Sequence, residues 1–425
     1  MKTTQPIIQS LLEPDFYKFT MGQFVWRRYS NAQVTYTFKN RTKGVNLGKV
    51  LDLGELKEEL DHARTLRFTN SELHYLRGTN EYGDRMFCEP YLEFLKNLRL
   101  PEYLLERDGE NIRLEFSGSW PEAIYWETQG LAIANGVYSK TLLRRLTSFE
   151  RECVYATGRL RLAERIAALR KNPDVLFSDF GTRRRFSGEW QQYVVETLRD
   201  ELSNSKQFLG TSNTYLAMQA GLVPMGTAAH ELFMVVAGLL DDGREDWLTA
   251  SQAEVLAGWW KEYGHGLSIF LPDTFGSDFF VRNLTQDQLI RWKGFRWDSG
   301  DPFVFGDRVI ERYKQCGVDP TTKLLIPSDG LDLTTILKLH TYFSGRIKMS
   351  YGWGTNLTND LFDNAWHGDL WYGPLSLVVK PSSINGRGLV KLSDNLAKAT
   401  GMSEDIERYK RAAGYTKADY VECTY

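Results

Sequence analysis

The sequence predicts an α/β protein in two parts, an α+β region over residues 1–130 and an α/β barrel over residues 131–385. Three observations support this prediction. The first part mixes alternating strand patterns with charged helical stretches. From about residue 173, short apolar runs each end in a polar, glycine-bearing loop, and helix-like sequence fills the intervals. Apolar residues make up 42% and charged residues 25%, which is ordinary globular composition.

The first part contains two predicted strands and two helical regions. Residues 34–38 alternate apolar and polar side chains, as a half-buried strand does, and residues 112–118 repeat this pattern. Residues 53–67 are charged and read as a helix. Residues 132–168 have helical apolar spacing and no proline, so we expect long helices there, leading into the second part.

Eight apolar runs supply the predicted strands of the second part: residues 175–177, 208–209, 222–225, 267–271, 295–297, 323–326, 346–349 and 377–380. In α/β barrels, the loops at the carboxyl ends of the strands carry the chemistry. An open doubly wound sheet has the same strand ends in sequence and stays an alternative. The barrel is favoured because so many strand ends carry polar loops, whereas an open sheet binds its ligand near one switch point.

Charge and cysteine content exclude several classes of protein. The 52 Lys and Arg residues against 54 Asp and Glu leave a net charge of −2, which disfavours nucleic acid as a partner. Four widely separated cysteines indicate neither a zinc site nor a disulfide framework. The first residues lack the apolar stretch of a signal peptide, and the longest apolar run, residues 232–240, is too short to span a membrane. We therefore expect a cytoplasmic protein without a membrane partner.

Several nucleotide and metal motifs are absent from the sequence. There is no Gly-x-x-x-x-Gly-Lys-[Ser/Thr] loop, and Leu357 follows Gly352 and Gly354 where a dinucleotide fingerprint has its third glycine. Met234 follows His230 where a zinc hydrolase has its second histidine. The sequence therefore disfavours hydride transfer on a Rossmann fold and zinc hydrolysis.

Three loops have the composition of phosphate sites. Small residues let main-chain N–H groups approach an anion, and arginine adds bidentate charge-assisted bonds. The loop 181–187 holds three consecutive arginines, which alone are more often a solvated surface, but it directly follows a predicted strand. The loops 328–330 and 352–356 have similar composition, although such turns are common. Together the loops predict a ligand with more than one phosphate.

Two further strand ends carry candidate catalytic groups. Asp298 stands with Asp301 and Arg296, where an acidic pair binds ribose hydroxyls or magnesium, or caps a helix. His230 opens an apolar helix, where a histidine is most often a polar cap. Its position also suits a nucleophile or phosphate acceptor, with Asp273 at another strand end to orient its ring.

At these residues the chain resembles the nicotinate phosphoribosyltransferase family in its bacterial form. The matching stretches are residues 15–21, 179–187, 210–213, 224–231, 298–302, 328–332, 354–357 and 391–394. They span nearly the whole chain in order, and the Asp-Phe-Gly-Thr-Arg-Arg-Arg and Gly-Thr-Ser-Asn loops are highly specific.

The resemblance implies the type II phosphoribosyltransferase fold, an irregular α/β barrel with a second domain that the N-terminal part forms with the C-terminal tail, about residues 386–425. It implies that nicotinate and 5-phosphoribosyl 1-diphosphate give nicotinate mononucleotide and pyrophosphate, in NAD salvage. ATP would be a co-substrate and Mg²⁺ a cofactor. It also implies a homodimer whose active sites are shared across the interface.

The resemblance further assigns roles to individual residues. His230 matches the family's phosphorylated histidine, with Asp273 as its partner, and Asp298 and Arg296 complete the catalytic set. Tyr17, lent by the neighbouring subunit, and Phe180 would sandwich the pyridine ring. The other implied substrate-binding residues are Thr182, Arg183, Ser212, Ser328, Asp329, Gly330, Gly352, Gly354 and Thr355.

Ser212 bears on the choice of substrate. Related enzymes that use nicotinamide carry an aspartate at the matching place, and a neutral serine beside Arg183 or Arg296 favours the acid over the amide. A sister enzyme for nicotinamide or quinolinate stays an alternative, as does a non-catalytic regulator that binds pyridine nucleotides. A sugar-phosphate aldolase or isomerase would need a Schiff-base lysine or a base at a strand end, for which Lys380 is the candidate lysine.

Overall fold

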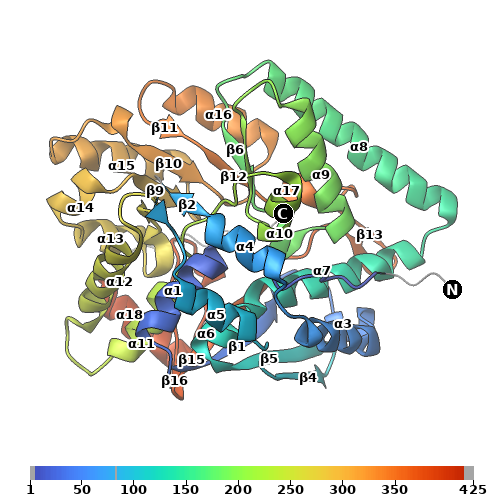
Figure 1. Ribbon diagram of the computed structural model, residues 1–425, viewed down its shortest axis with the longest axis horizontal. Helices are drawn as coiled ribbons and strands as arrows, with labels where there is room; N and C mark the ends of the chain where they lie inside the picture. Colours follow the sequence, from blue (N-terminus) through green and yellow to red (C-terminus); the bar gives the residue numbers. More distant parts are fainter. Residues whose placement is uncertain (1–4, 82–83, 416–425) are drawn as a thin grey trace.

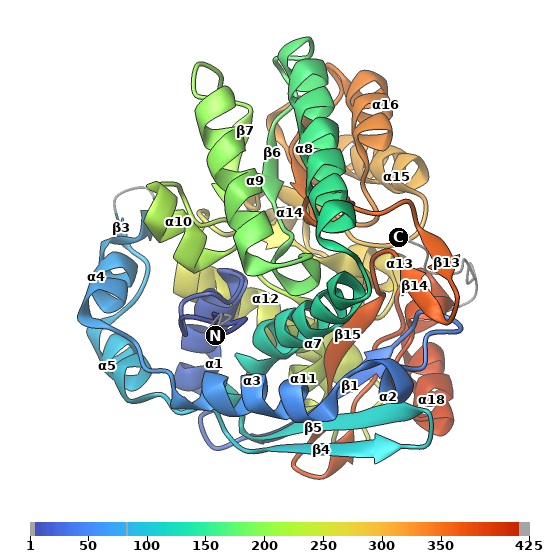
Figure 2. The same cartoon turned by 90° about the vertical axis from the view of Figure 1, so that its right-hand side faces the viewer.

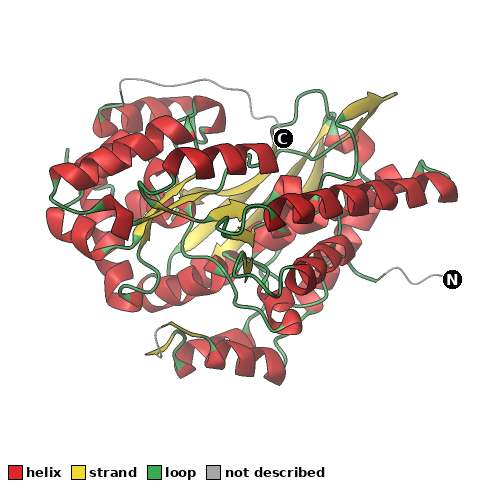
Figure 3. Cartoon of the chain, turned by 90° about the horizontal axis from the view of Figure 1, so that it is seen from above, coloured by secondary structure: helices red, strands yellow, loops and turns green. Residues whose placement is uncertain are grey.

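The computed structural model describes residues 5–81 and 84–415, in which helices surround a central group of strands and other strands lie at one edge (Figures 1 and 3). The strands of these residues form a five-stranded antiparallel sheet, two parallel sheets and two hairpins. The hairpins pair β2 (Asn80–Glu81) with β3 (Asp84–Arg85) and β13 (Ala365–His367) with β14 (Leu370–Tyr372). The predicted α/β class is confirmed.

The antiparallel sheet combines early strands with late ones. In spatial order its strands are β16 (Arg387–Gly388), β15 (Leu377–Ile384), β1 (Gln33–Asn40), β5 (Asn111–Ser119) and β4 (Tyr103–Asp108). In β1, Val34, Tyr36 and Phe38 are buried, whereas Thr35 and Thr37 bond to hydroxyl groups of neighbouring strands. The alternation in the sequence thus correctly predicts one buried face.

Helices from the first part and α11 (His230–Leu240) pack beside this sheet, and Figure 2 shows α7 and α11 on one side of it. The helices of the first part are α1 (Tyr17–Arg28), α2 (Leu47–Val50), α3 (Leu53–Thr65), α4 (Asn70–Gly78), α5 (Glu89–Asn97), α6 (Trp120–Ala123) and α7 (Trp126–Arg144). The helices predicted over 53–67 and 132–168 are found as α3 and as α7 followed by α8 (Ser148–Arg170).

The second part of the chain forms a curved layer of parallel strands. One sheet has the order β12 (Tyr351–Trp353), β6 (Phe177–Asp179), β7 (Phe208–Thr211); the other has the order β11 (Lys348–Met349), β10 (Leu324–Pro327), β9 (Gly294–Trp297), β8 (Ile269–Phe270). Ser350 connects the two sheets, because β11 pairs with β10 and β12 pairs with β6. Closure into a full barrel stays a prediction, since no strand pairing among the described residues joins β7 to β8.

Further helices and 3₁₀ turns connect and cover these strands (Figure 1). The helices are α9 (Gly188–Glu201), α10 (Thr214–Ala220), α12 (Trp247–Tyr263), α13 (Ser277–Arg282), α14 (Gln286–Arg291), α15 (Pro302–Gln315), α16 (Leu333–Phe343), α17 (Thr355–Thr358) and α18 (Ser403–Ala413). The 3₁₀ turns are η1 (Thr182–Arg184), η2 (Pro272–Thr274), η3 (Pro320–Thr322) and η4 (Leu396–Lys398). No helix in the described part of the chain is long and apolar enough to cross a lipid bilayer.

Two of the eight runs predicted as barrel strands are not strands of the parallel sheets. Residues 222–225 contribute only a bridge between Thr211 and Pro224, because proline has no N–H to extend a ladder. Residues 377–380 begin β15, which pairs antiparallel with β1 and lies outside the parallel layer. The sequence pattern shows that a strand is buried but does not show which strand it pairs with. The boundaries at residues 130 and 385 stay predictions.

Candidate active site

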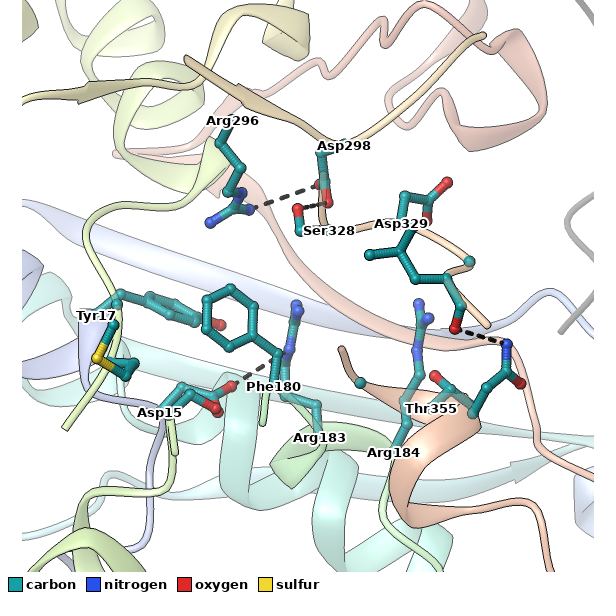
Figure 4. A pocket seen from close by; sticks show the side chains of 17 residues that line it. Asp15, Tyr17, Phe180, Arg183, Arg184, Arg296, Asp298, Ser328, Asp329 and Thr355 are labelled. Atoms are coloured by element: carbon teal, nitrogen blue, oxygen red, sulfur yellow. Dashed lines mark hydrogen bonds and ion pairs between the residues drawn. The ribbon is translucent and has the colours of Figure 1, made fainter. Parts of the chain in front are cut away.

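A cavity lies at the carboxyl ends of the parallel strands, where the loops after β6, β7, β9, β10 and β12 meet the segment before α1. Its lining residues are Asp15, Tyr17, Phe180, Arg183, Arg184, Ser212, Met225, Gly226, Arg296, Asp298, Ser328, Asp329, Gly330, Leu331, Gly354, Thr355 and Asn356. Figure 4 shows Asp298 and Ser328 on one side and Phe180 and Arg183 on the other. The structure therefore brings most of the sequence-predicted site residues together.

A second chamber adjoins the first and shares Tyr17, Arg183, Arg296 and Asp298 with it, among other residues. His230 lines this second chamber. So do Arg41, Lys391 and Lys398, which the sequence did not lead us to place in the site, and Lys380, which we had named only as the possible Schiff-base lysine of an alternative enzyme. Such a concentration of cations suits a ligand with several phosphate oxygens.

The two predicted aromatic residues lie at the first cavity, on segments far apart in sequence. Tyr17 opens α1 and donates its hydroxyl hydrogen to Glu127 Oε2 at 3.1 Å. Phe180 follows β6 and is half-buried. We had predicted that Gly352 binds substrate, but it does not line the cavity. It lies against Phe180 instead, where an added Cβ atom would come within 2.6 Å of the ring. A glycine is required there by this close approach.

The chain's own N-terminal segment supplies the tyrosine. The Phe16 N–H donates to the Ser212 carbonyl at 2.7 Å, and the Ser212 hydroxyl donates to Asp15 Oδ1 at 2.6 Å. Asp15 also forms a bridge with Asn213. These contacts hold the segment against the end of β7 in the same chain, so Tyr17 and Phe180 of one chain line one cavity. That a neighbouring subunit completes the active site stays a prediction.

The loop after β6 is shaped by a buried aspartate. Asp179 accepts hydrogen bonds from the Gly181 N–H, the Gln191 amide and the Thr211 hydroxyl, at 2.8, 2.8 and 2.7 Å. Burial raises the pKa of Asp179 to about 6. Thr182 belongs to this loop, but its side chain is buried and does not line the cavity. This position differs from its predicted role as a substrate ligand.

Arg183 connects the two chambers electrostatically. Its Nε lies 3.4 Å from Asp15 Oδ2, its Nη1 lies 3.8 Å from Glu127 Oε1, and its guanidinium carbon lies 5.9 Å from the Tyr17 ring centre. Burial alone would lower the pKa of Arg183. The net effect is a raised pKa, because the interactions with Tyr17, Asp15 and Glu127 outweigh burial. The Asn135 amide of α7 holds the Arg183 carbonyl at 2.9 Å. The side chain is therefore a fixed, permanently charged group.

His230 is buried and its closest acidic neighbour is Asp298. The Nε2 atom lies 2.8 Å from Asp298 Oδ2 and 3.6 Å from Asp273 Oδ1, so the predicted partner Asp273 is the more distant one. The Nδ1 atom lies 3.1 Å from the Thr274 hydroxyl. Burial, helped by Lys391 and opposed by the two aspartates, lowers the pKa of His230 to about 4. The imidazole is therefore neutral at pH 7, as a phosphate acceptor requires.

Asp298 stands between the histidine and the first cavity. Burial would raise its pKa, but Arg296, the hydrogen bond with His230 and Lys398 together hold the pKa of Asp298 well below its usual range. Arg296 Nη2 lies 3.7 Å away, and the Ser328 hydroxyl donates to Asp298 Oδ1 at 3.1 Å. Asp298 is therefore a fixed negative charge facing the ligand space.

His230, Asp273 and Asp298 are also a group that could hold a metal ion, with ligand atoms within 4.8 Å of one another. Asp273 Oδ1 is buried without a hydrogen-bond partner. Carboxylate oxygens are the ligands that Mg²⁺ prefers, whereas imidazole suits other metals. The two aspartates therefore fit Mg²⁺.

The loops after β10 and β12 form the remaining wall of the first cavity. Ser328, Asp329 and Gly330 come from the first of these loops, and Gly354 and Thr355 come from the second. Gly330 has φ of 60°, a left-handed conformation that favours glycine. These five predicted phosphate ligands are all at the cavity surface.

Several residues of the site could not be found from sequence motifs. Glu127 resembles an ordinary acidic residue in the first turn of a helix, yet it is fully buried at the second chamber. Arg41 lies in a loop and Lys398 ends η4, and neither position carries a motif. Lys391 belongs to a stretch that carried the family resemblance, which was the one available signal.

Comparison with known proteins gives consistent matches over nearly the whole chain. The model of the nicotinate phosphoribosyltransferase (NAPRTase) family matches residues 175–417, and the model of that family's N-terminal domain matches residues 12–135.

Solved structures agree with these matches. A nicotinate phosphoribosyltransferase from Vibrio cholerae is 32% identical, with 97% of this chain and 95% of that chain covered and a TM-score of 0.85. One from Porphyromonas gingivalis is 27% identical, with 96% and 100% covered and a TM-score of 0.80. A putative nicotinate phosphoribosyltransferase from Saccharomyces cerevisiae is 26% identical, with 97% and 100% covered and a TM-score of 0.83. The chain therefore belongs to the nicotinate phosphoribosyltransferase family.

Proposed function

We propose that this chain joins nicotinate to 5-phosphoribosyl 1-diphosphate, giving nicotinate mononucleotide and pyrophosphate. The pyridine nitrogen would form a bond to the ribose C1 atom with its lone pair while the bond from C1 to the diphosphate oxygen breaks. The observation that carries the proposal is that Tyr17 and Phe180 line a cavity beside Asp298, next to a chamber rich in cations.

The residues of the two chambers suit the parts of this reaction. Tyr17 and Phe180 would hold the flat ring by stacking. Since the ring nitrogen carries a lone pair at neutral pH, the enzyme needs no general base there. Asp298 would stabilise the positive charge that develops on the ribose, and Arg183 and Arg296 would stabilise the departing pyrophosphate.

The remaining polar loops suit the other phosphate. The residues at 328–330 and 354–355 would bind the 5′-phosphate through main-chain N–H and hydroxyl groups. The cations of the second chamber would neutralise the diphosphate. These are Arg41, Lys380, Lys391 and Lys398.

We propose nicotinate rather than nicotinamide as the substrate. Ser212 is neutral, and Arg183 and Arg296 line the same cavity, so a carboxylate can be paired there. Asp15 also lines the cavity, but burial raises the pKa of its carboxyl group. The raised pKa lessens repulsion of the substrate carboxylate.

We further propose that ATP transfers its terminal phosphate to His230, which couples ATP hydrolysis to the reaction. In this step the bond between the β-γ bridging oxygen and the γ-phosphorus breaks, a bond from that phosphorus to an imidazole nitrogen forms, and ADP leaves. The neutral, buried imidazole and the cations beside it support this role. Label from γ-labelled ATP should remain on the protein after base treatment and not after acid treatment. Label retained in His230→Ala would contradict the assignment.

Magnesium is proposed as the metal cofactor. Asp298 and Asp273 would hold it. When bound, Mg²⁺ neutralises phosphate charge and stabilises the leaving group.

The proposed cellular role is NAD salvage in the cytoplasm. Three cysteines of the described residues, Cys88, Cys153 and Cys316, are free, which is compatible with a reducing compartment.

Pyrophosphate release tests the proposed reaction. The purified chain with Mg²⁺, ATP and 5-phosphoribosyl 1-diphosphate should release pyrophosphate when nicotinate is added. Release with nicotinamide or quinolinate in preference to nicotinate would show a sister enzyme. No release with any of the three would support a binding protein, and Asp298→Asn provides the inactive control.

A further inference from the structure

A chain of buried charges runs behind both chambers. Lys18 is fully buried between two carboxylates, with its Nζ 2.6 Å from Glu127 Oε2 and in contact with Glu231. Tyr36 donates its hydroxyl hydrogen to Glu231 Oε1 at 3.1 Å. Removing ions from water is costly, so such a cluster persists only where its geometry is closely matched.

Glu127 is the member of this cluster of buried charges that lines the second chamber and also contacts two residues that line the first, Tyr17 and Arg183. Its Oε1 accepts a hydrogen bond from Lys380 Nζ at 2.6 Å, and its Oε2 accepts hydrogen bonds from Lys18 and from the Tyr17 hydroxyl. Its Oε1 also lies 3.8 Å from Arg183 Nη1. Tyr17 and Arg183 line both chambers, whereas Lys380 lines only the second.

We infer that Glu127 is a positioning residue that fixes Tyr17 for the pyridine ring while restraining Arg183 and Lys380, the two cations that face the phosphates. This inference rests on the proposed function. It predicts that the Glu127 carboxylate affects the binding of both substrates, although it takes no part in the bond changes of the reaction.

The charges predict opposite effects on the two substrates when this carboxylate is neutralised. Without the negative charge, Lys380 and Arg183 are freer to pair with phosphate, so the diphosphate substrate should bind as tightly as before or more tightly. The Tyr17 hydroxyl loses a charge-assisted hydrogen bond, so Tyr17 should hold the pyridine ring less firmly.

This opposition separates positioning from two simpler roles. Nicotinate is itself an anion, so a purely electrostatic effect of removing the carboxylate would lower KM for both substrates. A purely structural effect, such as local unfolding, would raise KM for both substrates. Only a positioning role raises one KM without raising the other.

The test measures KM for each substrate with the other saturating, in wild type and in Glu127→Gln. We expect KM for nicotinate to rise at least about fivefold, as loss of one hydrogen bond to a charged group implies. KM for 5-phosphoribosyl 1-diphosphate should stay the same or fall. If both KM values change in the same direction by similar factors, the inference is overturned.

The matched control is Glu59→Gln. Glu59 is also a buried, ion-paired glutamate that contacts α7, through Lys140 at 2.7 Å, and it also accepts from the Ile7 N–H at 2.8 Å. It lines neither chamber, so both KM values should stay unchanged. A split of the two KM values in Glu59→Gln as large as that in Glu127→Gln would overturn the inference.

Tyr17→Phe serves if Glu127→Gln does not fold. It removes only the hydroxyl that donates to Glu127, and it should raise KM for nicotinate while leaving KM for the diphosphate substrate unchanged. An unchanged KM for nicotinate in this variant would contradict the positioning role. The wild type is assayed first, so that a failure of the proposed function, with no pyrophosphate released, is distinct from a failure of this inference.

Discussion

At the scale of single residues, burial decides the protonation of the groups that face the ligand. His230 is buried, and its pKa is lowered to about 4 although two aspartates lie within 3.6 Å. The hydrogen bonds explain how the imidazole can be neutral and still lie beside two carboxylates. Neutral imidazole can donate from Nε2 to Asp298 and accept from the Thr274 hydroxyl at Nδ1.

This protonation predicts how stability depends on pH. Between the ordinary pKa of 6.5 and the folded value of about 4, the unfolded chain binds a proton at His230 and the folded chain does not. The folded state therefore loses stability as pH falls through this window, by about 3 kcal/mol in total, and this contribution is constant above it. Urea unfolding at pH 7, 5.5 and 4.5 gives the free energy of unfolding of wild type and of His230→Gln. Between pH 7 and 4.5 this free energy should fall less in the variant than in wild type. The same dependence of this free energy on pH in both proteins would contradict the lowered pKa of His230.

A charge at position 212 should change the preference between nicotinate and nicotinamide. Its hydroxyl is 2.6 Å from Asp15 Oδ1, so Ser212→Asp would place two carboxyl groups together at the ring site. We expect kcat/KM for nicotinate to fall at least about tenfold and the ratio of nicotinamide to nicotinate turnover to rise, because like charges repel the acid. The control is Ser212→Ala, which adds no charge. An unchanged ratio in Ser212→Asp would show that discrimination lies elsewhere.

At the scale of elements, β12 and β6 act together to set the position of the aromatic ring. The two strands pair in parallel, with Gly352 opposite Ser178, and the absence of a side chain at Gly352 leaves room for Phe180. Asp179 then fixes the start of the following loop by accepting three hydrogen bonds. The geometry of the ring site is therefore set by the backbone of two strands.

Gly352→Ala tests this dependence on the backbone. The added Cβ would lie 2.6 Å from the Phe180 ring, so the ring must move. We expect a loss of about 1–3 kcal/mol in stability and a higher KM for nicotinate. Thermal unfolding and steady-state kinetics measure the two effects. Gly78→Ala is the control, since a Cβ atom there would have no neighbour within 4 Å, and it should leave KM unchanged.

At the scale of the whole molecule, the fold brings the beginning of the chain to the ends of the parallel strands. The segment at Asp15 and Phe16 pairs with residues that follow β7, although nearly 200 positions separate them in sequence. Tyr17 and Phe180 of one chain therefore line the same cavity.

Mixing two inactive variants tests whether a site is complete in one chain. Tyr17→Ala and Asp298→Asn should each lose activity, and coexpression of the two should restore none beyond their sum. Shared sites would regain part of the wild-type activity, because some assemblies would then contain one intact site. Pyrophosphate release per milligram of the mixture is the measurement, with each variant alone as the control.

Local patterns were sufficient to predict many elements and loops. The alternation at Val34, Tyr36 and Phe38 predicted β1, because a half-buried strand must alternate. The loops after β6, β9 and β10 were predicted as site loops, because parallel strands bring their carboxyl ends to one edge. The partner of β15 could not be predicted, since its buried face is compatible with either sheet.

The sequence by itself determined the class of the fold, the family and the polar loops that line the cavity, because these depend on residue types at short spacing. Only the tertiary structure decided which strand β15 pairs with, that Tyr17 lines a cavity with Phe180, that Asp298 is the acidic group nearest to His230, and that Glu127 contacts residues of both chambers. Each of these depends on distances between residues far apart in the chain, and such distances are set by the packing of the whole molecule.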